Sequence, residues 1–423
     1  MTATGLAPVR TRLDNGAVII TKQSRVTPAV TVYAAVAAGS AFDPPAQAGL
    51  AHFVSKTIDR GTGSRSAEQI AEALDSRGVS LTTSVNRHTL SLVCTCLEED
   101  LEAVLALVAD ILMHPTFPAD EVATRRGEIV TLIRQDEDSP AAMAGEGLMT
   151  LLYGTDHPYG RRLRGTVESV ESIDRDALVG FHQARFTPAA LTLVLVGDVE
   201  PGRAVAAATA AFAAWPPAAA VAPVFPPIPA SAARRVQLMP MMNKAQADIA
   251  YGFTAIERSD PAYYAYWLMN NILGQYAIGG RLGDSIRETQ GMAYYVFSGL
   301  DANVIPGPFI VRAGVNPANV ERAVASIDAE LERMAAEGPT DRELAESRQY
   351  LIGSMPRNLE TNAGIATFLQ MVEVFGLGLD YDLRVPGLLG AVTRDEVLAA
   401  ARALLMPSRA AVVVAGPYAG PLA

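Results

Sequence analysis

Hydrophobic and polar positions follow two different periods along the first half of the chain. Residues 9–22 alternate around Asp14-Asn15-Gly16, a turn sequence that favours the positive φ angles of a tight hairpin. Buried strands are predicted where apolar residues dominate, at 29–38, 79–84, 89–97 and 191–196. Helical spacing predicts helices, at 66–77, 98–113, 118–136, from 140, 174–185 and 201–215. Strands mixed with hairpins and helices, rather than strictly alternating with them, favour an α+β fold.

The pattern changes after residue 215. Six prolines between 216 and 229 interrupt an Ala-rich stretch, and prolines this close together exclude a helix. We therefore interpret 216–233 as an extended linker between two domains. Beyond it the same two periods predict strands at 246–254, 292–300 and 309–315, and helices at 261–273, 281–288, 318–334, 341–355 and 362–375.

The two halves of the chain are alike at their ends. Residues 172–197 align without a gap with residues 391–416, and each segment contains an Arg-Asp helix start, a proline turn and an apolar strand that ends in Gly. A repeat of this length predicts duplication of a whole folding unit. The sequence thus predicts two copies of one domain, at 1–215 and 234–423, joined by the linker.

Composition excludes several classes of protein. The chain has 423 residues, of which 50% are hydrophobic and 19% charged, enough for two or more compact cores. A net charge of −11 argues against a nucleic-acid partner, because neutralising phosphates needs clustered Lys and Arg. No apolar run reaches the roughly 18 residues of a membrane span, and residues 1–12 lack the apolar core of a signal peptide. We expect no membrane span, and the compartment stays open between cytoplasm and periplasm because a leader could have been trimmed.

The stretch 49–62 carries an altered metal motif. In H-x-x-E-H, two histidines one helical turn apart hold zinc, and the glutamate acts as general base on the metal-bound water. Here His52 occupies the first position, Ser55 replaces the glutamate and Lys56 replaces the second histidine. A lysine ammonium has no lone pair for a metal. Ser55 and Lys56 do not make a nucleophile and base either, since helix neighbours point to different faces.

Several separated motifs occur along the chain in the same order as in a known protein family. The chain resembles the M16 metallopeptidases, the pitrilysin and mitochondrial processing peptidase group, and in size their M16B branch. The motifs that carry the resemblance are Gly39-Ser40, Gly49-Leu-Ala-His52-Phe, Arg60-Gly61-Thr62, His157-Pro158-Tyr159-Gly160, Gly165-Thr166, Gly280-Arg281-Leu282 and Gly291-Met292-Ala293-Tyr294. The resemblance implies two homologous domains, each a sheet covered by helices, that together form one half of a clamshell.

The resemblance also implies a third zinc ligand, a Glu on a later helix. The segment Asp136-Glu137-Asp138-Ser139-Pro140 sets the register and puts Leu132 at that position. Glu128 lies one helical turn earlier and is the alternative carboxylate. One His and one displaced carboxylate leave zinc short of its usual three protein ligands, so we expect no cofactor in this chain. His52 is then expected to be a packed helix histidine.

A second constellation keeps the family pattern. The resemblance implies that Arg287, near a helix end, and Tyr294, at the start of the next strand, reach a substrate bound at a zinc site. Both side chains donate hydrogen bonds that suit a carbonyl oxygen or an oxyanion. The alternative is an exposed helix Arg and a core Tyr without a shared role. Tyr295 adds a second phenol beside the first.

These features predict the zinc-less subunit of a heterodimeric M16B zinc peptidase. The resemblance implies a homologous partner with an intact H-x-x-E-H motif and its zinc, and extended or unfolded peptides as substrates. Alone, the chain is expected to have no proteolytic activity. Two alternatives stay open: a catalytically inert structural or peptide-binding protein, as in core subunits of the respiratory complex that resemble processing peptidases, and a homo-oligomeric hydrolase with an unorthodox site.

Overall fold

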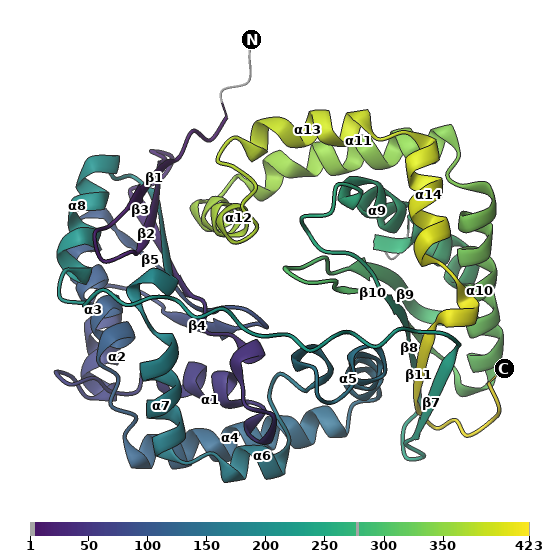
Figure 1. The fold of residues 1–423 in the computed structure, drawn as a ribbon, viewed down its shortest axis with the longest axis horizontal. Coiled ribbons are helices and arrows are strands. Elements are labelled where there is room, and N and C mark those ends of the chain that lie inside the picture. The colour runs from purple at the N-terminus through teal and green to yellow at the C-terminus, as the bar shows by residue number, and fades with distance from the viewer. Residues whose placement is uncertain (1–4, 276–278, 423) are drawn as a thin grey trace. The chain divides into compact units, whose positions relative to one another are not determined.

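The computed structural model describes residues 5–275 and 279–422, which form two compact units. Unit 1 comprises the chain up to Arg134 together with Arg162–Phe225 and Pro356–Asp382. Unit 2 comprises Gln135–Arg161, Pro226–Met355 and the chain from Leu383 onward. Figure 1 labels most of the helices and strands of both units.

Unit 1 is built on a six-stranded sheet in the order β1-β2-β6-β3-β5-β4. The strands β2 and β6 pair in parallel, and the other neighbours pair antiparallel. The predicted hairpin is present, because β1 pairs with β2 around Gly16 at φ 100°. The strands are β1 (Val9–Arg12), β2 (Val18–Gln23), β3 (Ala29–Val36), β4 (Thr82–Val85), β5 (Leu90–Leu97) and β6 (Leu191–Gly197).

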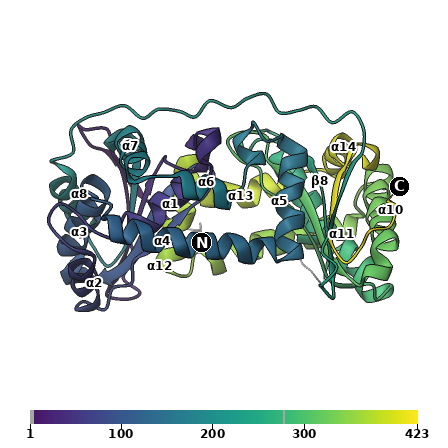
Figure 2. The same cartoon turned by 90° about the horizontal axis from the view of Figure 1, so that it is seen from below.

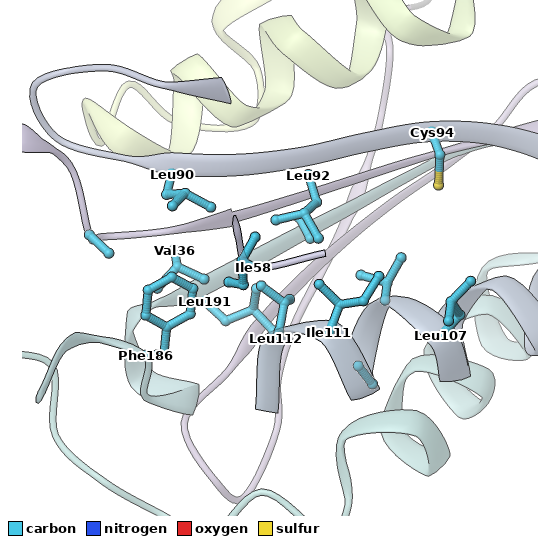
Figure 3. Packing of buried hydrophobic residues seen from close by; sticks show 14 of the residues in the cluster. Val36, Ile58, Leu90, Leu92, Cys94, Leu107, Ile111, Leu112, Phe186 and Leu191 are labelled. Atoms are coloured by element: carbon cyan, nitrogen blue, oxygen red, sulfur yellow. The ribbon is translucent and has the colours of Figure 1, made fainter. Parts of the chain in front are cut away.

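Helices cover both faces of this sheet. On one face, Leu90 and Leu92 of β5 pack against Leu107 and Ile111 of α3 in a large apolar core (Figure 3). On the other face, a smaller cluster joins β2 and β6 to α12, which comes from the second half of the chain. The helices of unit 1 are α1 (Leu50–Thr57), α2 (Ala67–Asp75), α3 (Leu101–Met113), α4 (Ala119–Glu137), α6 (Val167–Ser172), α7 (Arg175–Arg185), α8 (Pro201–Phe212) and α12 (Asn362–Val374).

Unit 2 repeats this plan with a five-stranded sheet in the order β7-β11-β8-β10-β9. Its parallel pair is β7 with β11, and the remaining neighbours are antiparallel. The strands are β7 (Arg235–Pro240), β8 (Ala247–Thr254), β9 (Ala293–Leu300), β10 (Pro308–Val315) and β11 (Ala411–Gly416). Apart from the extra β1, each strand has a counterpart at the same place in the sheet of unit 1.

One face of the second sheet is covered by a helix from the first half of the chain. The helix α5 (Pro140–Tyr153) packs on β8 and β11, and a Cβ at Gly147 would lie 3.1 Å from Val413 of β11. The helices α10 (Val320–Glu337) and α14 (Arg394–Leu404) lie on the opposite side of the sheet from α5 (Figures 1 and 2). The second half also contains α9 (Tyr263–Asn270), α11 (Asp341–Asn358), α13 (Tyr381–Ala391), and the π-helices η6 (Asn271–Gln275) and η7 (Gly283–Thr289).

The predicted α+β fold with two similar domains is confirmed, and the sequence repeat has a direct structural counterpart. The helices α7 and α14 start and end at aligned positions, and each is followed by a 3₁₀ turn that begins at a proline and by a buried strand. The division at 1–215 and 234–423 stays a prediction, because the compact units exchange α5 and α12 across it. The structure describes every residue between Phe212 and Arg235, and this stretch contains no helix or strand (Figure 2). The predicted linker, 216–233, lies within it. Within the described residues, no helix is long and apolar enough to cross a membrane.

Candidate functional site

The start of helix α1 is held by the side chain of Asp43 and by close backbone contacts at Gly49 and Gly165, not by the altered motif. Asp43 accepts hydrogen bonds from the backbone N–H groups of Gly49, at 2.9 Å, and Ala51, at 2.8 Å, which satisfies donors at the helix start. Gly49 has φ 95°, and a Cβ there would lie 2.4 Å from the carbonyl oxygen of Arg164. Gly165 has φ 78° and makes the reciprocal approach to the carbonyl of Ala48. Both family glycines are therefore needed for close packing.

The three motif positions on α1 lie in a mainly apolar setting. His52 is 7% exposed and Ser55 is 1% exposed. The Ser55 hydroxyl donates to the carbonyl oxygen of His52 at 2.7 Å, so it is used by its own helix. Lys56 is half-buried and carries a positive charge where a second imidazole would be required. None of these positions supplies the second nitrogen ligand or the general base.

The helix α4 supplies no third ligand. Leu132 is half-buried and apolar. Glu128 is 52% exposed and held by the guanidinium of Arg125 at 2.7 Å. The buried face of α4 instead carries apolar side chains, and Arg126 lies 5.6 Å from the ring centroid of Phe53 on α1.

These residues do not fit a zinc ion. Catalytic zinc takes three protein ligands from His, Cys, Asp or Glu, and α1 and α4 offer one buried imidazole between them. Across residues 5–275 and 279–422, no group of three or more such side chains could hold a metal.

Two further motifs of the first half are structural. Asp110 accepts hydrogen bonds from Thr62 and Ser64 at 2.7 Å and from Arg65 at 2.9 Å. Burial opposes ionisation of this carboxyl group, but these hydrogen bonds, together with one to His114, outweigh it and lower the pKa of Asp110. His157 is buried against the rings of Tyr153 and Tyr159, with centroids 5.2 and 5.6 Å away. Packing and hydrogen bonding account for these side chains without a catalytic role.

Arg287 and Tyr294 both lie in unit 2, at adjoining ends of η7 and β9. Arg287 is partly exposed, and its ion pair with Glu288 is long, at 3.6 Å. Gly291, at φ 61°, ends η7 and donates its N–H to the carbonyl oxygen of Arg287 at 3.0 Å. The chain therefore turns directly from the helix into β9, and η7 packs against that strand.

Tyr294 lies at a β-bulge on an edge strand. Gly314 of β10 pairs with Tyr295 and Val315 pairs with Ala293, so Tyr294 has no partner residue across the ladder. Its side chain is 62% exposed. Tyr295 differs sharply, because its hydroxyl donates a short hydrogen bond to the buried carboxylate of Asp248. The exposed phenol of the pair is thus Tyr294, and it is not a core residue.

The structure adds two side-chain interactions that sequence reasoning missed, at Asp248 and at Arg281. Asp248 is 3% exposed in the apolar strand β8, and a lone acid in such a strand is a signal that the sequence does carry. Arg281, two residues before η7, donates two hydrogen bonds, of 2.6 and 2.8 Å, to Glu343 of α11. Burial opposes ionisation of Glu343, but the bonds from Arg281 and Thr340 lower its pKa to about 2. The clamp between Arg281 and Glu343 spans distant segments and has no local signal.

Two models of known protein families match consecutive stretches of the chain. Residues 18–166 match the family model described as "Insulinase (Peptidase family M16)", and residues 172–351 match "Peptidase M16 inactive domain". The chain belongs to the M16 peptidase family. The resemblance predicted from the motifs is confirmed, and the two similar domains are M16-type domains.

Relatives of this M16 chain match it over nearly its whole length. An uncharacterized zinc protease of Mycobacterium tuberculosis is 29% identical over 427 residues, covering 98% of this chain and 94% of that protein. One of Streptomyces coelicolor is 28% identical, covering 96% of this chain and 89% of that protein. A solved structure of a peptidase M16 inactive domain from Pseudomonas fluorescens is 26% identical with a TM-score of 0.91, and covers 99% of this chain and 100% of that one.

Proposed function

We propose that this M16 chain is the zinc-less subunit of a two-chain M16B peptidase. The observation that carries the proposal is a contrast within one chain. His52 remains, but the general-base position and the other two zinc-ligand positions are Ser55, Lys56 and Leu132, which cannot do those tasks. Arg287 and Tyr294 are present, and Tyr294 is 62% exposed. An exposed phenol at a β-bulge fits a residue aimed at a ligand, because bulges commonly redirect side chains beside active sites.

In this proposal the metal belongs to a homologous partner with an intact H-x-x-E-H helix. Zinc bound there supplies activated water. The guanidinium of Arg287 and the hydroxyl of Tyr294 donate hydrogen bonds to the carbonyl oxygen of the scissile peptide bond. The same donors then stabilise the negative charge that develops on this oxygen, which is typically worth about 3 kcal/mol for each aimed donor.

The substrate in this proposal is a peptide or unfolded polypeptide in extended form. Tyr294 lies on β9, the last strand of its sheet. Edge strands leave backbone donors and acceptors unpaired, which lets an extended peptide add alongside. An extended backbone is also the shape that presents a carbonyl group to donors on a strand.

The test is reconstitution with a candidate M16 partner that carries the intact motif. We expect cleavage of a quenched peptide to require both chains, with kcat lowered roughly 100-fold by Arg287→Ala and by Tyr294→Phe, the loss typical of one oxyanion donor. Arg342→Ala and Tyr418→Phe make the same chemical changes elsewhere, at an exposed Arg342 that pairs with Glu346 and at a half-buried Tyr418 that pairs with Glu321. These two controls should keep the wild-type rate.

Two results would count against the proposal. Full activity of the partner alone would favour the alternative of an inert structural or peptide-binding M16 protein. Cleavage by this chain alone, with zinc bound through His52, would favour the unorthodox hydrolase.

A further inference from the structure

A row of residues crosses the sheet of unit 2 immediately beside Tyr294. Tyr295 of β9 pairs with Gly314 of β10, and Gly314 pairs with Asp248 of β8. The three residues therefore stand side by side on neighbouring strands. Because Gly314 has no side chain, the ring of Tyr295 can cross over it and reach the second strand away.

The space above Gly314 is filled by the side chains of Tyr295 and Gln246. A Cβ at Gly314 would lie 2.5 Å from Cε1 of Tyr295 and 2.4 Å from Nε2 of Gln246. The Tyr295 hydroxyl donates to Asp248, and Gln246 Nε2 donates to the same carboxylate at 3.0 and 3.2 Å. Asp248 is 3% exposed. A buried carboxylate without donors is costly, so these hydrogen bonds hold Tyr295 firmly.

The bulge links this row to the exposed phenol. A bulged residue has no ladder partner to fix it, so its direction depends on the residues that flank it. On one side of Tyr294 the flanking residue is Ala293, which is small. On the other side it is Tyr295, which is anchored two strands away. Releasing Tyr295 would let the bulge relax and turn Tyr294.

We propose that Tyr295 and Asp248 are positioning residues that fix the direction of Tyr294 through the β-bulge. The inference rests on the proposed function, since the direction of Tyr294 matters for catalysis only if its hydroxyl meets a substrate. It predicts that neither Tyr295 nor Asp248 touches the peptide. They affect kcat only by fixing the direction of the Tyr294 side chain.

The kinetic test is a double-mutant cycle in the reconstituted two-chain peptidase. We expect Tyr295→Phe to lower kcat roughly 10- to 100-fold, the loss that a misplacement of about 1 Å can cause, with KM changed less than about twofold. In the Tyr294→Phe background, Tyr295→Phe should cause no further loss, because the hydroxyl it positions is already gone. Asp248→Asn retains an acceptor for the Tyr295 hydroxyl and should keep most of the activity, whereas Asp248→Ala should not.

A second readout needs neither the partner nor activity. With 3-fluorotyrosine incorporated in the full chain, the ¹⁹F resonance of residue 294 is assigned by its loss in Tyr294→Phe. We expect Tyr295→Phe to shift or broaden this resonance, and the half-buried control Tyr418→Phe to leave it unchanged. If Tyr295→Phe does not unfold the chain but leaves the resonance as in the wild type, the positioning role is wrong.

The two proposals fail in different ways. If Tyr294→Phe lowers kcat but Tyr295→Phe does not, or if their losses multiply, the positioning role is overturned and the function stands. If Tyr294→Phe and Arg287→Ala both leave kcat unchanged, the proposed function is overturned, and the fluorine spectrum alone decides whether Tyr295 directs Tyr294.

Discussion

The sheets of the two units share a strand order, but the units differ in the polar side chains that their candidate sites present. In unit 1, α1 keeps its backbone frame, with Gly49 and Gly165 in close contact and Asp43 at the helix start, while Lys56 stands where His52 would need a second zinc ligand. In unit 2, Arg287 near the end of η7 is partly exposed, and Tyr294 at the bulge is 62% exposed. The residues that build an M16 helix and those that hold its metal are therefore separate sets, so one set can change alone.

The largest expected effect is zinc binding by a variant of unit 1 in which the missing ligands are restored. Combining Lys56→His with Leu132→Glu should complete a three-ligand site with His52. We expect near-stoichiometric zinc by elemental analysis and a Kd of ~1 µM or below, which is about 8 kcal/mol of binding free energy.

The control for this gain uses the neighbouring residue on α4. Thr131 is exposed and its hydroxyl bonds back to Gly127, so Lys56→His with Thr131→Glu should bind zinc poorly. Equal zinc binding by both double variants would show that Leu132 does not occupy the third-ligand position.

A smaller effect is expected where the family glycines shape unit 1. Gly165→Ala should destabilise the chain by about 3 kcal/mol, because φ is 78° and the new Cβ would lie 2.1 Å from the carbonyl oxygen of Ala48. Gly63→Ala is the matched control, with open space around it. Urea unfolding of both variants measures the difference, and similar midpoints would contradict a steric role for Gly165.

The clamp on η7 in unit 2 should respond to pH. Glu343 has a pKa lowered from 4.5 to about 2, so its stabilisation is fully present above the unfolded value and is lost as the pH falls towards 2. We expect Glu343→Gln to cost about 1–3 kcal/mol at pH 7 and clearly less at pH 3. Urea midpoints at both pH values test this.

Glu346→Gln provides the comparison for this clamp. Its partner Arg342 is 86% exposed, and exposed ion pairs contribute about 0–1 kcal/mol. A pH-independent loss in Glu343→Gln would mean that the carboxylate charge does not stabilise η7.

The smallest effect is expected at the turn between Arg287 and Tyr294. Gly291 has φ 61°, and a Cβ added there would meet nothing within 4 Å, so Gly291→Ala should cost only about 1 kcal/mol from backbone strain. Gly353→Ala, inside α11 and equally open, should instead stabilise by about 0.5–1 kcal/mol. Thermal unfolding that moves both variants in the same direction would contradict this explanation.

The sequence alone was enough for the fold class, the repeated domain and the altered metal motif. Each of these depends on local signals: apolar runs for β3 and β6, the capping box at Ser66, and residue types at fixed spacing around His52. The sequence also carries a chemical argument against zinc at this motif, because a lysine ammonium has no lone pair for a metal.

Only the tertiary structure decided the rest. The exchange of α5 and α12 between the units, the clamp of Arg281 on Glu343 and the bond from Tyr295 to Asp248 all join residues far apart in the chain. It also decided which of two adjacent tyrosines is exposed. Alternation along a strand assigns faces only while the register is regular, and the bulge beside Gly314 interrupts it.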